Sequence, residues 1–190
     1  MMGLMFTRVF IGTFLALLFF LPPVFAQENS SSSGVIMIPP TPDTSYSYPL
    51  PYPGILPDNP LYSLKMVRDK IILFLITDPY KKAQFNLLQA DKRLQAGVFL
   101  IQSDKKKAEL AISTISKGEN YFHEAVIQVL AMKREGRDVT AFLGDLDHAA
   151  SKHIEVLMNM KKDLPDKQGD IDQLIRQLKI YQTQVVSVKQ

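Results

Sequence analysis

The sequence predicts an all-α protein: an elongated, antiparallel up-down bundle of four long helices, preceded by one short apolar helix. Three observations predict this class. From residue 58 onward, apolar residues recur every three or four positions, which is typical of helices that pack like coiled coils. Capping residues and prolines divide this region into segments joined by short connections. No alternating run of β-branched residues with a hairpin dipeptide competes with the helical pattern.

The first 26 residues have the pattern of a secretory signal peptide. Arg8 precedes the apolar run Val9–Leu21, which a proline pair ends, and Val24 and Ala26 supply small residues before a cleavage site. The run is shorter than the roughly 20 residues that a spanning helix needs, so an uncleaved anchor is the weaker alternative. We therefore expect residues 1–26 to be a signal peptide. The mature chain would then be secreted or extracytoplasmic (periplasm or cell surface), with no stable membrane span.

Residues 27–57 are predicted to be a flexible linker rich in Ser, Pro and Tyr. Eight of the 12 prolines of the chain fall between residues 39 and 60, and such a segment buries too little apolar surface to order itself. Tyr46, Tyr48 and Tyr52 indicate either a docking strip for a partner or a spacer whose last aromatic residues lie on the bundle. We favour the spacer.

Residues 58–190 are predicted to form the helical-bundle domain, with helices at 60–76, 79–101, 104–134, 138–163 and 166–188. Asp58-Asn59-Pro60 and Thr77-Asp78-Pro79 each place a capping side chain just before a proline at the first helical position, and Asp138 is the expected N-cap of the fourth helix. Basic residues followed by Gly136 end the third helix.

Each long helix has one predicted apolar seam. Small residues in the seams of 79–101 and 104–134 predict a close approach of this pair. The seams are Tyr80, Ala83, Leu87, Ala90, Leu94, Gly97 and Ile101; Ala108, Ala111, Ile115, Gly118, Phe122, Ala125, Val129 and Met132; Val139, Leu143, Leu146, Ala150, His153, Leu157 and Met160; and Ile171, Leu174, Leu178, Tyr181, Val185 and Val188.

The short helix 60–76 differs because Ile71–Ile76 is apolar on every face. A helix that is apolar all round is usually buried, so we expect it to lie under the bundle. A helix that binds a partner or rests on a membrane is the alternative.

The sequence shows no catalytic constellation, so we expect a protein that is not an enzyme and has no cofactor. No serine lies in a Gly-x-Ser-x-Gly turn, and the nine glycines form no phosphate-binding loop. A di-iron bundle would need Glu-x-x-His, and none of the three histidines has Glu three residues before it. No catalytic or metal-ligating residue is therefore predicted. His123, His148 and the run Lys105–Lys107 are expected to be solvated, and the net charge of +3 is too small to indicate nucleic-acid binding.

His153 falls on the apolar seam of helix 138–163 and therefore needs a hydrogen-bond partner across the bundle. We expect a neutral structural histidine whose pKa lies below about 6.5, so that its replacement by Leu is neutral or stabilising. A carboxylate across the seam would reverse the sign and raise the pKa. A pH-responsive or ligand-binding role is the other alternative.

Four ordered motifs carry a resemblance to a known family. They are the start Pro53-Gly54-Ile55-Leu56-Pro57-Asp58-Asn59-Pro60, the second start Asp78-Pro79-x-Lys81-Lys82-Ala83, the pair Arg93-Leu94, and the stretch Lys152-His153-Ile154-Glu155-Val156-Leu157. Over about residues 53–180 the chain resembles a family of exported bacterial domains, known as domain of unknown function 5667. The resemblance implies a helical extracytoplasmic domain and brings no known activity, cofactor or catalytic residue.

The function that we expect is that of an exported, non-enzymatic helical bundle that binds an unknown protein or an envelope component. Two alternatives remain open. An extracytoplasmic helical chaperone or stress sensor would need an exposed, concave apolar surface. A metal- or haem-binding bundle would need facing His or carboxylate side chains, which the seams do not show.

Overall fold

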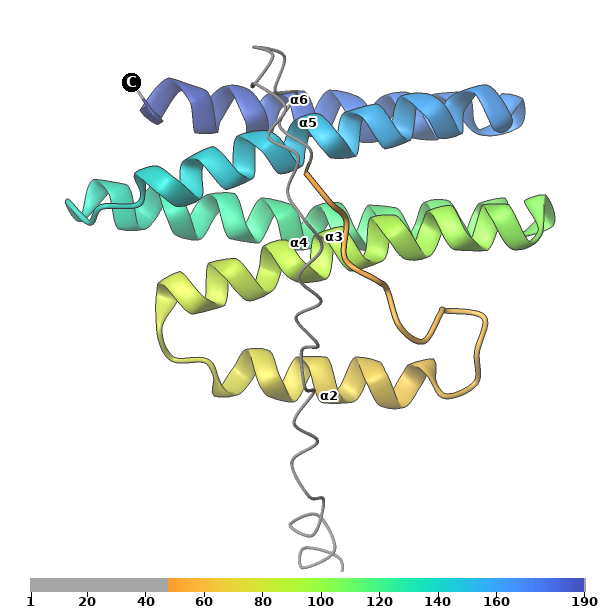
Figure 1. Ribbon diagram of the computed structural model, residues 1–190, viewed down its shortest axis with the longest axis horizontal. Coiled ribbons are helices and arrows are strands. Elements are labelled where there is room, and N and C mark those ends of the chain that lie inside the picture. The colour runs from red at the N-terminus through yellow and green to blue at the C-terminus, as the bar shows by residue number, and fades with distance from the viewer. Residues whose placement is uncertain (1–47, 190) are drawn as a thin grey trace, which may run out of the picture. The chain divides into compact units, whose positions relative to one another are not determined.

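The computed structural model describes residues 48–189, which lie in one compact unit, Thr44–Gln190. The predicted signal peptide and residues 27–47 of the predicted linker lie outside the described residues. The described chain is helical and contains no strand, which confirms the all-α prediction (Figure 1). Its helices are α2 (Tyr62–Leu75), α3 (Pro79–Ser103), α4 (Ala108–Arg134), α5 (Thr140–Asp163) and α6 (Gln168–Lys189), with short 3-10 turns η2 (Lys105–Lys107) and η3 (Pro165–Lys167).

The four long helices form two hairpins that pack against each other. Helix α3 packs along α4, and α5 packs along α6, because only a few residues join the members of each pair. The hairpins meet where α4 contacts α6 and α3 contacts α5. Figure 1 shows the four helices side by side and α2 alone beyond α3, on the side away from α5 and α6.

The predicted seams are the core of the bundle. The largest fully buried side chains come from all four long helices: Leu94, Leu100, Ile115, Phe122, Met132, Phe142, Leu143, Leu146, His153, Leu157, Ile171 and Leu178. The predicted close approach of α3 and α4 is also present. A Cβ added to Gly118 would lie 2.9 Å from Cβ of Arg93 and 3.2 Å from the carbonyl oxygen of Ala90, so the backbones meet where only glycine fits.

The start of α3 matches the predicted cap, whereas α2 and α5 begin later than predicted. Asp78 caps α3, since its carboxylate accepts a hydrogen bond of 2.8 Å from the Lys81 backbone N–H. Before α2, the side-chain oxygen of Asn59, the residue just before Pro60, accepts from the Leu61 N–H at 2.9 Å. The helix itself begins at Tyr62, two residues later than predicted, and its N-cap position, Leu61, has no side-chain cap.

The turn between α4 and α5 also follows the sequence closely. Gly136 has a φ of +79°, and the Arg137 N–H donates to the Met132 carbonyl at 3.0 Å, so the helix ends in a Schellman-type turn. Asp138 accepts from the Thr140 N–H at 3.1 Å, but α5 begins at Thr140, two positions later than predicted, and its N-cap position is Val139 rather than Asp138.

The prediction that helix 60–76 is buried under the bundle is wrong. Leu64 and Phe74 of α2 are 69% and 84% exposed, whereas Asp69, the acidic residue of this helix, is only 4% exposed. The physical reason is that α2 meets the bundle through polar contacts on one side. Its apolar residues therefore point away from the core.

Residues 48–57 contain no helix, and several of them contact the bundle. The Tyr48 hydroxyl donates to Asp91 on α3 at 2.8 Å, and the rings of Tyr52 and Phe99 lie 6.0 Å apart. The Pro53 carbonyl accepts from Lys65 Nζ at 2.9 Å. The last aromatic residues before the helices therefore lie on the bundle, as the favoured interpretation of this segment expected.

Candidate functional site

The outward side of α2 is an apolar surface, which we call the α2 face: Leu64, Val67, Ile71, Phe74 and Leu75. All five side chains are more than half exposed. Successive residues of an α-helix turn by about 100°, so these five positions share one side of the helix. Clusters of exposed apolar side chains mark interaction sites more often than isolated ones do. The α2 face is therefore the first candidate site.

The opposite side of α2 is held by Arg93 of α3. The buried guanidinium donates to the Tyr62 hydroxyl at 3.1 Å and contacts the Met66 sulfur at 3.2 Å. It also lies over the ring of Tyr121 on α4, 4.7 Å from the ring centre, in a cation–π contact. Tyr62 and Met66 lie on the same side of α2 as buried Asp69. Because Arg93 contacts this side, it fixes which side of the helix faces outward.

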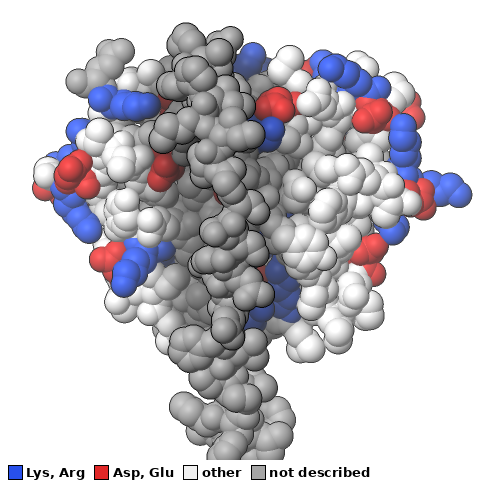
Figure 2. Space-filling view, viewed as in Figure 1, with Lys and Arg blue, Asp and Glu red and all other residues white. Residues whose placement is uncertain are grey.

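Basic side chains border the α2 face. Arg68 and Lys70 are exposed and lie on opposite edges of the face, given the turn of about 100° per residue. Arg68 bonds Asp69 at 2.7 Å, so that acid is both buried and paired. Lys65 is half-buried, and burial lowers its pKa from the ordinary value. In Figure 2, the lower part of the described surface, where Figure 1 places α2, carries few charged atoms.

A charged centre lies inside the bundle around His153 of α5. The imidazole is fully buried. Its Nε2 lies 2.8 Å from an Asp91 oxygen of α3, and its Nδ1 lies 3.0 Å from a Glu119 oxygen of α4. The other Asp91 oxygen accepts from Tyr48, whereas the second Glu119 oxygen is buried without a hydrogen-bond partner. A seam histidine with partners across the bundle was expected, but both partners are carboxylates.

The protonation of His153 follows from this geometry. Burial alone lowers its pKa, but the charge of Glu119 and hydrogen bonds to Asp91 and Glu119 outweigh burial and raise the pKa to about 9. The imidazole is then cationic at neutral pH, and both ring nitrogens donate to carboxylates. The expectation of a neutral histidine with a lowered pKa is therefore wrong, and the alternative with a carboxylate across the seam holds.

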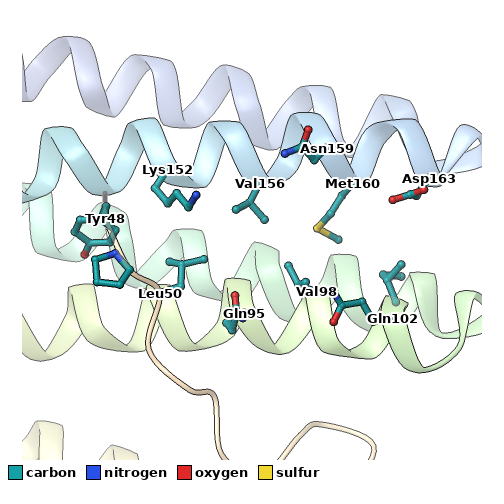
Figure 3. Close-up of a pocket in the computed structure, with 12 residues that line it drawn as sticks. Tyr48, Leu50, Gln95, Val98, Gln102, Lys152, Val156, Asn159, Met160 and Asp163 are labelled. Atoms are coloured by element: carbon teal, nitrogen blue, oxygen red, sulfur yellow. The ribbon is translucent and has the colours of Figure 1, made fainter. Parts of the chain in front are cut away.

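A groove of about 480 Å³ runs between α3 and α5 (Figure 3). Tyr48 and Leu50 lie at one end of it, and Val98 and Val156 face each other across it. Its lining combines these apolar side chains with amide side chains and with charged side chains such as Lys152. The groove is the weaker candidate.

The remaining predicted polar residues are distributed over the surface. His123 is half-buried, and its ring stacks on that of Tyr181 with the centres 4.7 Å apart, so the expectation of a solvated side chain is wrong there. His148 is also half-buried rather than exposed. Lys105 and Lys106 are exposed as expected, whereas Lys107 pairs with Asp58 at 2.8 Å.

The described residues contain neither a cluster of metal-ligating side chains nor a helix that could span a membrane. No group of three or more His, Cys, Asp or Glu side chains between residues 48 and 189 is arranged to hold a metal ion. Within the same range, every helix is too short or too polar to cross a membrane.

Sequence reasoning missed the roles of Asp91 and Glu119, and it named Arg93 only as part of a family motif. Asp91 directly follows seam residue Ala90, and Glu119 directly follows Gly118. A carboxylate next to a small seam residue, on a helix that faces a seam histidine, is the signal that would have found the charged centre. Arg93 has no comparable signal, because its partners on α2 and α4 are revealed only by the packing.

Fold and site together define a small helical-bundle domain that carries one further helix with an outward apolar face. The chain belongs to the family described as Domain of unknown function (DUF5667), whose model matches residues 54–167. The match runs from Gly54 to the end of η3 and so includes α2, Arg93 and the whole charged centre. Comparisons with curated proteins and with solved structures gave no match.

Proposed function

We propose that this chain is an exported, non-enzymatic module that attaches to a component of the cell envelope through the α2 face. The observation that carries the proposal is the orientation of α2. Its acidic residue Asp69 is buried against the bundle, while Leu64, Ile71 and Phe74 point outward. A helix placed this way offers its apolar side to something outside the domain.

Two further features support attachment. The side chains that hold α2 are charged or polar groups with specific partners, Arg93 with Tyr62 among them, so the orientation is defined by directional contacts. Export is supported by the signal-peptide pattern of residues 1–26. After export the chain is surrounded by envelope components, so these are the nearest partners for an outward apolar helix.

The test is cell fractionation of a bacterial host that expresses the full chain. We expect the unchanged protein to sediment with the envelope. The variant Leu64→Gln/Ile71→Gln/Phe74→Gln removes the apolar character of the α2 face without changing the charge, and it is expected to move to the soluble extracytoplasmic fraction. Circular dichroism of both purified proteins verifies that the bundle is intact.

The matched control is Ile127→Gln/Met158→Gln/Ile180→Gln. These residues lie on α4, α5 and α6 and are about half exposed, so the same chemical change is made outside α2. The control should stay with the envelope. Equal distribution of the α2 variant and the control would contradict the proposal.

A further inference from the structure

We infer that the envelope component that α2 binds is the surface of an anionic lipid bilayer, on which the helix lies flat. The inference rests on the proposed function and names the partner of the same face. The apolar side chains would enter the boundary between headgroups and acyl chains, as in other amphipathic helices that lie in a membrane interface.

The length of α2 favours a flat orientation. At about 1.5 Å per residue its 14 residues extend roughly 21 Å, which is shorter than the hydrocarbon thickness of roughly 30 Å. The helix is also fixed to the bundle through Arg93, so its opposite side stays with the domain. Only the α2 face is then free to enter the bilayer.

The basic border of the α2 face favours an anionic surface. Lys70 lies on one edge of the face and Arg68 on the other, and both side chains are exposed, but the Arg68 guanidinium is bonded to Asp69, so Lys70 supplies the uncompensated charge of this border. Long basic side chains at the border of an apolar face extend toward lipid phosphates while their stems cover apolar surface. Lys81, exposed at the start of α3, adds a third basic group close to the end of α2.

The acidic groups near α2 do not oppose such a surface. Asp69 is buried and bonded to Arg68. Asp78 is occupied as the N-cap of α3, and Asp58 pairs with Lys107 of η2. The exposed charge on α2 itself is therefore positive.

The same charges disfavour a second copy of the chain as the occupant. A symmetric pairing of two α2 faces would bring the basic borders of both copies together. No exposed acidic residue of α2 is available to compensate them. A bilayer rich in anionic lipid supplies the missing negative charge.

The experiment measures co-sedimentation with vesicles of phosphatidylcholine alone and of phosphatidylcholine mixed equally with phosphatidylglycerol. The protein is the full chain as exported by an expression host, with its N terminus established by intact mass. We expect binding to the mixed vesicles, much weaker binding to phosphatidylcholine, and a loss of binding as salt is raised.

Two matched pairs of variants locate the binding. Lys70→Gln should weaken binding to the mixed vesicles about fivefold, whereas Lys117→Gln, which changes another exposed lysine on α4, should leave it unchanged. Leu64→Gln/Ile71→Gln/Phe74→Gln should abolish binding, and Ile127→Gln/Met158→Gln/Ile180→Gln should retain it.

Several results would overturn the inference. Equal binding to both vesicle types would show that anionic lipid is not recognised, and equal loss in the members of either pair would exclude α2. If the chain binds no vesicle but its α2 variant still leaves the envelope fraction, the partner is a protein. The proposed function then stands and the lipid inference fails. Concentration-dependent dimers that the α2 variant abolishes would assign the face to a second copy.

Discussion

Helices α4 and α2 both carry apolar residues at helical spacing, yet the two are placed in opposite ways. On α4, Ile115 and Phe122 are fully buried, and the exposed side is mostly polar, with Leu110 and Ile127 as its exposed apolar residues. On α2, Leu64 and Phe74 face outward and Asp69 faces the bundle. The difference shows that apolar spacing defines a side of a helix, but does not decide what that side contacts.

Polar partners make the decision in both helices. Glu119 of α4 enters the core because His153 receives it, and the side of α2 with Tyr62 faces the bundle because Arg93 donates to the Tyr62 hydroxyl. The contact between α2 and the bundle depends on Arg93 rather than on interlocking apolar side chains. We therefore expect changes inside the bundle to alter stability strongly, and changes on the α2 face to alter attachment instead.

The largest effect is expected from His153→Leu. This change leaves Asp91 and Glu119 buried without their cation, and breaking a buried ion pair in this way costs roughly 3–5 kcal/mol of unfolding free energy. Chemical denaturation followed by circular dichroism measures it, with His123→Leu as the control on the bundle surface. A loss below about 1 kcal/mol, as for a neutral seam histidine, would contradict the charged centre.

The pH dependence of stability should follow the same histidine. Its pKa is about 9 in the folded protein and about 6.5 when unfolded. The stabilisation is then fully present below about pH 6.5 and is lost as the pH rises toward 9, by an amount on the order of 3 kcal/mol. Denaturation curves of the unchanged protein and of His153→Gln between these values test this. An increase in stability with pH that is present in the unchanged protein and absent in His153→Gln would contradict this prediction.

The seams could be predicted from the sequence because the four long helices pack against one another. Nearly every predicted seam residue is therefore covered by a seam of a neighbouring helix. The orientation of α2 could not, because Ile71–Ile76 offers apolar side chains in every direction. Only part of the charged centre could be predicted: His153 is a polar residue on an apolar seam, so a buried histidine with a hydrogen-bond partner was expected. The two carboxylates of the centre directly follow the small seam residues Ala90 and Gly118, which becomes a signal only when the facing seam histidine is considered together with them.

An intermediate effect is expected where α3 meets α4. Gly118→Ala would place a Cβ against Arg93 and the Ala90 carbonyl and should cost roughly 1–3 kcal/mol. Gly144→Ala on α5 is the matched control. No atom lies within 4 Å of the added Cβ, so this variant should be stabilised by about 0.5–1 kcal/mol through helix propensity. Thermal unfolding that gives both variants the same sign would contradict the close approach.

The smallest effect on stability is expected on the α2 face. Leu64→Gln and Phe74→Gln should each change the free energy of unfolding by no more than about 0.5 kcal/mol, because neither side chain is buried. Denaturation in urea measures both. A loss above about 2 kcal/mol in either variant would mean that the face packs against the bundle like α4 does.

The outward orientation of α2 can be measured directly because the chain contains no cysteine. A single thiol introduced as Phe74→Cys should react with a thiol reagent in the native protein as fast as it does in urea. A thiol introduced as Val129→Cys, at a fully buried position of α4, should react only when the protein unfolds. If the Phe74→Cys thiol is as protected as the Val129→Cys thiol, the α2 face is covered within the chain, and our account of α2 as an attachment surface is wrong.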